Sequence, residues 1–537
     1  MINDPNRVYD GFFSMEAGVD AGRAANVIDT NECVSAENMT FRGGKPAVRP
    51  AWRRLRIEDE DFTNGNHSYY EDGGDAYNQV IPNRSAKENF NHGIFQCAHA
   101  YSPHVGPDSL MVMIGGRLYR VIPYVNNAKV TEVSIEDQTG EKYPPGHPNA
   151  GKLRNKRNRN TLAIAYMVQA DKWFIVQDGE SSAILYDGAK ARRAITDTVR
   201  DKTEIPVGTM MAYGMGRVCL VVNERDIAFG DLFGSHDQPD PADALVMFTE
   251  RNFLTEGFDA AIPFEQGIAT GLAFFPQLDT STGNGQLLVF AQRGAQAFFL
   301  NLQRELWKES QFQIAALLTT GLRGHRSISI ANEDLWFRSD DGVRSFRQAR
   351  SEQYGWAHIP HSTNVKQFVR TDTNRLLQYC SSIYFDNRVL FTTSPYPNAT
   401  RPFHTGAVVV DFDILSSFGA KVAQPCWDGH WTMPNNIGIT QFVAGTFNGV
   451  TRAFAFVLED DLQRNALYEL TMDDRDDVTG YEDGPKPKPE LNESMIPISQ
   501  RVEWEWVTRA FDFKQESTPF TELELYDADL WLKDIIE

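Results

Sequence analysis

Short apolar runs separated by turn-forming residues fill the middle of the chain. In LMVMIGGRLYRV (Leu110–Val121) two apolar runs flank Gly115-Gly116, and in SIYFDNRVLFT (Ser382–Thr392) two flank Asp386-Asn387. Two-residue connections of this kind are a strong β-hairpin signal. Four further segments show the same pattern. Hairpins are predicted at Trp173–Asp187, with a turn at Asp178-Gly179, and at Ile205–Val222, with Gly214 and Gly216 at its tight connection. They are also predicted at Gly285–Leu300, with a turn around Arg293-Gly294, and at Ser327–Phe346, with turns at Asn332-Glu333 and Asp341-Gly342.

This pattern predicts an all-β fold. Closely spaced strands with turn signals are typical of rings, sandwiches and barrels, and amphipathic helical periodicity is scarce. The chain has no exact repeat of the WD or kelch type. We therefore expect a degenerate β-propeller with an extended N-terminal arm and inserted loops or a small β subdomain. Its blades would be antiparallel meanders that cover one another's faces.

Composition along the chain suggests five segments. Met472–Ser499 combines acidic residues with alternating prolines and is expected to be extended and exposed. Arg501–Phe513 and Thr521–Leu532 alternate cleanly, so we expect strands that complete a blade begun elsewhere or pair with a neighbouring subunit. The predicted segments are an N-terminal arm (1–56), a polar exposed loop (57–91), the propeller body (92–471), an acidic and proline-rich insertion (472–499) and C-terminal strands (500–537).

The net charge of −20, from 52 basic and 72 acidic residues, argues against a protein whose main task is to grip nucleic acid. Such binding needs a Lys/Arg face. An acidic surface would suit a channel through which DNA slides without sticking. Two local basic clusters are interpreted as solvated loops or subunit contacts: Lys152, Arg154, Lys156, Arg157 and Arg159, and Lys190, Arg192 and Arg193.

The five cysteines are odd in number, widely spaced and without a CxxC pair, so neither a zinc site nor a disulfide framework is expected. A reducing compartment is the simplest interpretation. The first residues, MINDPNRVYDGFF, lack the pattern of a secretory signal. No apolar run approaches the roughly 18–20 residues of a membrane helix, so we expect no membrane segment.

Candidate metal ligands are few. His99 and His104 in HAYSPH and His358 and His361 in HIPH are close in sequence, but no acidic or cysteine partner lies beside them. An acidic segment offers oxygen ligands for calcium without the ordered spacing of a calcium loop, and solvated charge is the favoured interpretation. Its members are Asp473, Asp474, Asp476, Asp477, Glu482 and Asp483. We expect neither a metal nor another cofactor.

Catalytic motifs are also missing. The chain has no GxSxG elbow, Walker loop, HExxH or GxGxxG. Ser339-Asp340-Asp341-Gly342 resembles the Asp-box of sialidase propellers, with the glycine one residue early, and even a true Asp-box is a turn device. The tryptophans that could stack on sugars are assigned to core or interface positions instead. They are Trp427, Trp431, Trp504, Trp506 and Trp531.

The most distinctive segment is Gly18–Trp52, GVDAGRAANVIDTNECVSAENMTFRGGKPAVRPAW. Glycines and prolines alternate there with short apolar pieces and with arginines, which predicts an ordered, winding arm rather than a helix. The arm resembles the N-terminal segment of tail nozzle, or "stabilisation", proteins of short-tailed bacteriophages, in which a "TFRGG.P..RP.W" pattern opens a β-propeller chain. Two body segments, Trp173–Val222 and Gly321–Phe346, resemble the propellers of the same proteins.

The resemblance implies a structural virion protein rather than an enzyme. It implies a hexameric ring beneath the portal and adaptor that closes the channel and conducts DNA, without specific DNA binding, during ejection. Such a protein would be assembled in the host cytoplasm and reside in the virion tail. The expected role of the arm is assembly, with arginines bonded to carboxylates or carbonyl groups of the body or of a neighbour. The assembly residues are Arg23, Arg42, Gly43, Gly44, Arg49 and Trp52.

Two alternatives remain open from the sequence. One is a receptor- or glycan-binding tail propeller without catalysis. The other is a propeller enzyme that degrades polysaccharide, for which a carboxylate pair cannot be chosen among 72 acidic residues without geometry.

Overall fold

A computed structural model gives the fold of the chain. It describes residues 14–57, 90, 93–115, 117–126, 129–137, 164–180, 182–188, 191–194, 196–197, 202–203, 205–232, 258–275, 284–301, 313–318, 320–346, 360–394, 403–413, 426–434, 437–459, 464–471, 482–484 and 500–510. The predicted all-β fold is confirmed, because strands dominate these residues and the helices are short. The predicted strand at Thr521–Leu532 and nearly all of the predicted loop 57–91 lie outside them.

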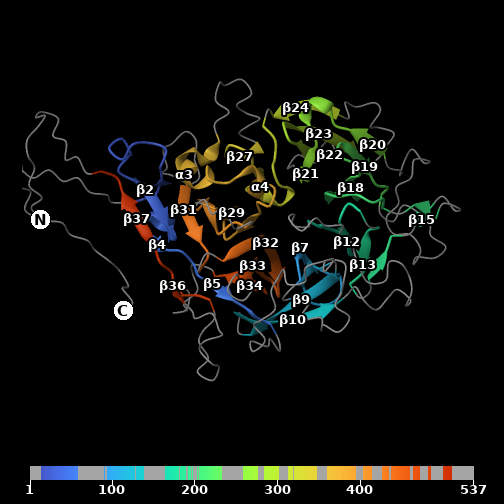
Figure 1. Cartoon of the computed structure of the whole chain (residues 1–537), viewed down its shortest axis with the longest axis horizontal. Helices are drawn as coiled ribbons and strands as arrows, with labels where there is room; N and C mark the ends of the chain where they lie inside the picture. The colour runs from blue at the N-terminus through green and yellow to red at the C-terminus, as the bar shows by residue number, and fades with distance from the viewer. Residues whose placement is uncertain are drawn as a thin grey trace, which may run out of the picture.

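Seven sheets of three or more strands are present in the described part of the chain, and they are the blades of a β-propeller (Figure 1). The first blade contains β7 (Phe95–Tyr101), β8 (Ser109–Ile114), β9 (Arg117–Asn126) and β10 (Lys129–Asp137). The second contains β11 (Tyr166–Ala170), β12 (Trp173–Gln177), β13 (Ile184–Tyr186) and β14 (Ala191–Arg193). The third contains β17 (Met211–Gly214), β18 (Arg217–Val221), β19 (Asp226–Phe229) and β20 (Phe258–Ala261).

The remaining blades follow the same antiparallel order. The fourth contains β21 (Ala269–Phe275), β22 (Asn284–Ala291), β23 (Gly294–Asn301) and β24 (Gln313–Leu318), and the fifth β25 (Ile328–Ala331), β26 (Asp334–Arg338) and β27 (Val343–Ser345). The sixth contains β28 (Ser382–Phe385), β29 (Arg388–Thr393), β30 (Gly406–Asp411) and β31 (Cys426–Thr432). The seventh contains β32 (Gly438–Phe447), β33 (Val450–Glu459) and β34 (Arg464–Leu470).

The core lies between neighbouring blades. Met113 and Phe174 join the first blade to the second, and Phe290 and Phe337 join the fourth to the fifth. Phe95 packs against Phe456, with ring centroids 5.2 Å apart, and so joins the first blade to the seventh. Each blade therefore buries both apolar faces against its neighbours, which is how a ring of sheets satisfies the hydrophobic effect.

The N-terminal arm closes this ring. Its strand β5 (Trp52–Arg54) pairs antiparallel with β34 and supplies the fourth strand of the seventh blade. Directly afterwards, β6 (Arg56–Ile57) pairs in parallel with β10 of the first blade. Earlier in the arm, β1 (Gly18–Val19) and β2 (Glu32–Glu37) extend the sheet of the sixth blade, and β37 (Glu505–Thr508) pairs with β2 at its outer edge.

Small elements complete the described structure. Short sheets are formed by β3 (Met39–Thr40) with β4 (Ala47–Val48), β15 (Thr196–Asp197) with β16 (Lys202–Thr203), and β35 (Glu482–Asp483) with β36 (Gln500–Arg501). The helical turns are η1 (Arg42–Gly44), η2 (Phe264–Gln266), η4 (His325–Ser327), η6 (His361–Val365), α3 (Lys366–Val369) and α4 (Asn374–Leu377). No helix in the described ranges is long and apolar enough to cross a membrane.

The predicted hairpin turns are largely confirmed. Strands end and begin on either side of Gly115-Gly116, Asp178-Gly179 and Asp386-Asn387. One turn is wrong by a residue: Ala291 faces Gly294, so Gln292-Arg293 forms the connection. Gly294 instead begins the second strand. All five cysteines are buried and free.

Candidate functional site: the amino-terminal arm

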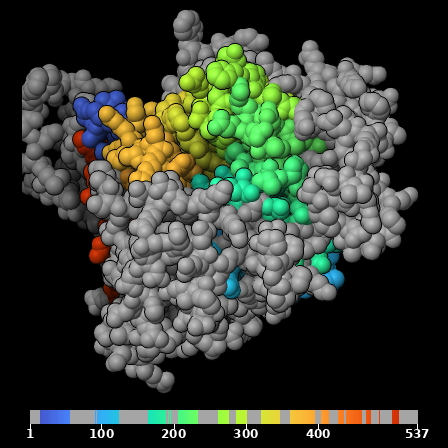
Figure 2. All heavy atoms as spheres, turned by 45° about the vertical axis from the view of Figure 1, so that its right-hand side comes forward, coloured from blue at the N-terminus to red at the C-terminus, as the bar shows by residue number. Residues whose placement is uncertain are grey.

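The arm crosses the outside of the sixth blade and reaches the seventh and first blades (Figure 1). In the space-filling view its blue atoms lie against the orange-yellow atoms around η6 and α3 (Figure 2). The Ala21 N–H donates to the Asn364 carbonyl there, at 2.7 Å. At the start of the arm, a Cβ on Gly18 would lie 2.2 Å from Cys426 Sγ, and the φ of Gly18 is +71°. Only glycine allows this strand to approach β31 so closely.

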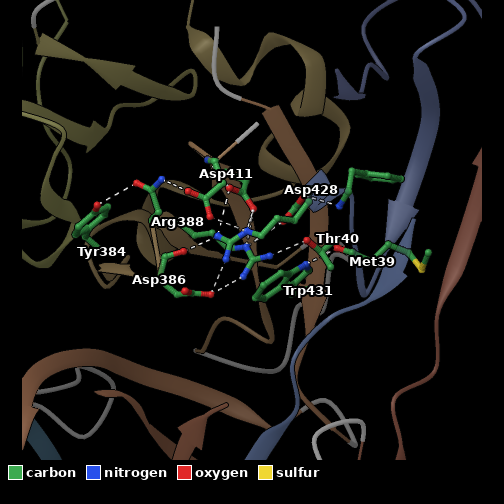
Figure 3. A network of polar contacts seen from close by, with 12 residues as sticks. Met39, Thr40, Tyr384, Asp386, Arg388, Asp411, Asp428 and Trp431 are labelled. Carbon is green, nitrogen blue, oxygen red and sulfur yellow. Dashed lines mark hydrogen bonds and ion pairs between the residues drawn. The ribbon is translucent and has the colours of Figure 1, made fainter. Parts of the chain in front are cut away.

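The centre of the site is the Arg388 side chain on β29, which is buried in the sixth blade (Figure 3). Its Nε donates to Asp411 Oδ2 at 2.9 Å and to Asp428 Oδ2 at 3.3 Å. A terminal nitrogen donates to Thr40 Oγ1 of the arm at 2.7 Å, and the guanidinium lies 5.3 Å from the Trp431 ring centroid. A buried guanidinium needs this many partners because its desolvation is expensive.

Arg42 brings a second positive charge from the arm to the same carboxylates. Its Nε donates to Asp411 Oδ2 at 3.0 Å, and Nη1 donates to Asp386 Oδ2 at 2.8 Å. Nη2 donates to the Asp386 carbonyl at 2.5 Å. Asp413, which is 40% exposed, adds a contact to Nε at 3.1 Å. The arm is therefore fixed to the sixth blade by charge-assisted bonds in several directions.

Asp428, like Asp411, is fully buried in this network. Its Oδ1 accepts the Phe41 N–H of the arm at 3.1 Å. Burial raises the pKa of Asp428 to about 7, against the opposing effect of Arg388, and the nearby Asp411 carboxylate raises that pKa further. Trp431, beside this network, donates its indole N–H to the Met39 carbonyl at 2.7 Å. Backbone groups of the arm are thus satisfied by side chains of the blade.

A second buried ion pair fixes the arm near its C-terminal end. Arg49 is 1% exposed and donates to Asp483 Oδ1 at 2.9 Å and Oδ2 at 2.6 Å, a bidentate geometry. It also donates to Asn38 Oδ1 and to the Thr432 carbonyl, each at 2.8 Å. Asp483 in turn accepts the Trp52 N–H at 2.7 Å. The expectation of an exposed, solvated Asp483 is wrong, because this residue is the counterion of a buried arginine.

Trp52 and the two arginines after it belong to the seventh blade. The Trp52 ring stacks on Phe442, with centroids 5.6 Å apart and planes 3° from parallel. Arg54 Nε donates to Glu459 at 2.8 Å, and Arg53 donates to Glu469 at 2.5 Å. The strand that closes the ring is therefore held by side-chain pairs as well as by its backbone ladder.

Arg23, Gly43 and Gly44 have local roles. Arg23 donates to Asp20, Glu32 and Asp29 and so cross-links residues 20–32 within the arm itself. Gly43 has a φ of +72°, and no atom of the described part of the chain lies within 4 Å of a Cβ placed on it. Gly44 is packed against Ser14, and its carbonyl accepts the Met15 N–H at 2.8 Å. The arginines of the predicted assembly set thus all bond carboxylates of the same chain, while their part in subunit assembly stays a prediction.

Other sequence candidates are scattered. His104 lies beside Asp171, and His361 packs on Trp336, whereas His358 and Asp473–Asp477 lie outside the described residues. No group of three possible metal ligands occurs among the residues that the structure describes. The Ser339 hydroxyl bonds Asp341 and the Gly342 carbonyl, so the Asp-box-like sequence forms a turn between β26 and β27.

The tryptophans and basic clusters fall in different environments. Trp427 and Trp431 are buried, Trp506 is half-buried and Trp504 is 54% exposed; Trp531 is outside the described ranges. Arg192 and Arg193 lie on β14, and the cluster from Lys152 to Arg159 is outside the described ranges. The buried tryptophans agree with their assignment to the core.

Sequence reasoning missed the acidic half of the site, namely Asp386, Asp411, Asp428, Glu459 and Asp483. A signal was available for two of them and for their partner Arg388. Asp411 ends GAVVVD and Asp428 sits in CWDGHW, while Arg388 interrupts an apolar strand run. Charges inside apolar strands are buried and must be paired.

Comparisons with solved structures find similarity at low sequence identity. No family model and no curated protein matches the chain. A crystal structure of BBS1N in complex with ARL6DN has 9% identity and a TM-score of 0.37, and covers 79% of this chain and 99% of that one. YCF48 bound to D1 peptide has 10% identity, a TM-score of 0.35 and coverages of 71% and 93%. A third structure is a humanized mutant of the Chaetomium thermophilum Polycomb Repressive Complex 2 bound to the inhibitor GSK126. It has 9% sequence identity and a TM-score of 0.34, and the match covers 72% of this chain and 95% of that one.

Proposed function

We propose that this protein is a structural component of the tail of a short-tailed phage, a ring-forming nozzle below the portal and adaptor that closes the channel and conducts DNA during ejection. It acts without catalysis or cofactor, is assembled in the host cytoplasm and resides in the virion tail. The proposal rests on the resemblance of the Gly18–Trp52 segment and of two propeller segments to such proteins.

One structural observation supports it most. The residues that carry the resemblance, Arg42, Arg49 and Trp52, are committed to contacts within the chain that fix the arm across the sixth and seventh blades. A signature segment used in this way is a structural brace rather than a ligand site. A braced, rigid propeller is a suitable subunit for a closed ring, the form that identical head-to-tail contacts favour.

The charge of the chain agrees with conduction of DNA. With 72 acidic and 52 basic residues, a lumen between subunits would repel phosphates rather than bind them. DNA would then pass through the lumen without a specific contact, and loops would hold it back by narrowing the opening.

The deciding experiment is reconstitution of the purified chain with the portal–adaptor complex, followed by cryo-EM. The expected result is a six-fold ring at the distal end of the portal and particles that retain their genome. Portal–adaptor particles without the protein are the control. A chain that stays monomeric alone and with the complex would overturn the proposal, and distal fibre-like density would favour a receptor- or glycan-binding propeller instead.

A further inference from the structure

The first strands of the seven blades surround the centre of the propeller. Contacts join them one to the next: β7 contacts β11 and β32, β17 contacts β11 and β21, and β28 contacts β25 and β32. In Figure 1, β7, β21 and β32 lie around the middle of the molecule. These strands therefore form the inner wall of the ring, and the later strands of each blade lie further out.

This inner wall carries no carboxylate, although the chain contains 72 acidic residues. Within the bounds of the seven described first strands, neither Asp nor Glu occurs. Lys and Arg are absent from them too, and His99 on β7 is the residue there that can become positive. A negative ligand at the centre would meet no like charge from these strands.

The turn η4 brings two further basic residues to this wall. It precedes β25 of the fifth blade and contacts β21 and β28. Arg326 reaches the first blade, where its Nη2 donates to the Gln96 carbonyl and its guanidinium lies 5.8 Å from the Phe95 ring centroid. The His325 ring meets the Tyr166 ring of the second blade edge-on, with centroids 5.8 Å apart. Basic groups from the fifth blade thus lie beside the first and second blades.

Hydrogen-bonding capacity remains unused in this cluster. Arg326 Nε and His325 Nδ1 are shielded from solvent, and neither has a hydrogen-bond partner in the described ranges. No carboxylate pairs with Arg326 in that part of the chain, whereas the buried Arg49 and Arg388 each pair with at least one. A guanidinium without a counterion is a suitable ligand for an anion.

The pKa of His325 reflects this excess of positive charge. Burial lowers the pKa of His325 to about 4, and the neighbouring Arg326 and His99 lower it as well. The other titratable groups of the cluster are Tyr166 and Cys97, and burial raises the pKa of both, so they are neutral at neutral pH. Among the described residues of the cluster, none offsets the charge of Arg326. A bound anion would offset it and would favour protonation of the imidazoles.

We infer that the centre of the propeller binds a small oxyanion of the sulfate or phosphate type, held by the Arg326 guanidinium and the imidazoles of His99 and His325. This site goes beyond the proposed function and does not depend on it. The fixed charge of Arg326 supplies the main attraction. Each imidazole adds a charge-assisted bond once it is protonated, so the anion and a proton bind together.

The test is isothermal titration calorimetry of the full chain with sodium sulfate, with sodium chloride of equal ionic strength as the blank. Arg326→Gln should weaken sulfate binding about tenfold or more, because it removes a charge-assisted bond. Arg293→Gln is the matched control, since it makes the same charge change at an exposed position in the turn between β22 and β23. Wild-type affinity should rise between pH about 8 and pH about 6, and His99→Gln should reduce that rise.

Inorganic phosphate is the second titrant: equal affinity for both anions supports a general oxyanion site, and a preference identifies the ligand. Thermal unfolding verifies the fold of each variant. If Arg326→Gln does not fold, the test passes to His99→Gln, at an exposed residue, which should weaken sulfate binding about fivefold at pH about 6. The site would be overturned by a wild-type chain that binds neither anion, by equal affinities of the two arginine variants, or by an affinity that does not change with pH.

Discussion

Arg42 and Arg388 donate to the same oxygen of Asp411, at 3.0 Å and 2.9 Å. One residue comes from the arm and the other from the sixth blade, so a single carboxylate joins two parts of the chain that are far apart in sequence. Asp386 also bonds both guanidinium groups, which makes the junction a closed network rather than a pair.

Asp411→Asn should release the arm. The substitution leaves two guanidinium groups short of a shared counterion, and removal of one partner from a buried pair costs about 3–5 kcal/mol. Urea unfolding should report this loss, and limited proteolysis should cut within residues 18–52 earlier than in the wild type. Asp413→Asn is the control: its side chain is 40% exposed, so it should lose about 1 kcal/mol or less. Equal stability of both variants would contradict the junction.

Gly18→Ala should be far more damaging than Gly43→Ala, although both residues have positive φ, +71° and +72°. Alanine at either position adopts an unfavourable backbone conformation, at a cost of about 1–2 kcal/mol. At Gly18 the added methyl also meets Cys426 Sγ and the Trp427 carbonyl, which adds about 1–3 kcal/mol, whereas no atom of the described residues lies within 4 Å of a Cβ placed on Gly43. Thermal unfolding compares the two. Similar losses would show that β1 does not dock on β31 as described.

Arg49 and Asp483 should show strong coupling in a double-mutant cycle. Arg49→Met and Asp483→Asn should each destabilise the chain by about 3–5 kcal/mol, because each leaves a buried charge without its partner. The double variant should lose clearly less than the sum of the two, as expected for residues in direct contact. Denaturant unfolding provides the three free energies, and additive losses would refute the pairing.

Asp428 should give stability an unusual pH dependence. Because its folded pKa of about 7 lies above the ordinary value of about 4, the folded state binds the proton more tightly than the unfolded state. The contribution of this group to stability is full below pH about 4 and is lost as pH rises to about 7. The wild-type free energy of unfolding minus that of Asp428→Asn should therefore fall across this range, and a flat difference would exclude the raised pKa.

His430 should act in the opposite direction. Its ring stacks on Phe368, and neither ring nitrogen has a hydrogen-bond partner among the described residues. Burial lowers its pKa to about 3, so the free energy of unfolding should decrease as pH falls from about 6.5 towards 3. His430→Phe should flatten that slope, whatever it does to stability at neutral pH. An unchanged slope in His430→Phe would contradict the lowered pKa of His430.

Much of the fold could be predicted from the sequence because its signals are local. Asp386-Asn387 and Asn332-Glu333 occupy positive-φ turns between apolar runs, and each marks a hairpin by its composition alone. The arm was also predictable, since its glycines and prolines exclude regular helix. The turn expected at Arg293-Gly294 lies instead at Gln292-Arg293, because Gly294 pairs with Ala291 as the first residue of the second strand.

The partners within the candidate site could not be predicted in the same way. Arg49 and Arg42 were visible as arm residues, but Asp483 and Asp411 lie more than 360 positions away, and spacing carries no information on such pairs. Asp483 also lies in an acidic and proline-rich stretch, and that composition predicts a solvated segment rather than a buried counterion. Its burial follows from the need of Arg49 for a counterion, which only the three-dimensional arrangement provides.

The strand that completes the seventh blade has a consequence for synthesis. The Ala51 N–H bonds the Thr471 hydroxyl, 420 positions later in the chain. At about 5–20 residues per second, a ribosome needs roughly 20–80 s to travel that distance. During this interval β5 has been synthesised but its partner β34 has not. The ring therefore cannot close until translation of the propeller body is nearly complete. In a nascent chain stalled before residue 464, β5 would therefore have no β34 to pair with, and the seventh blade would be incomplete.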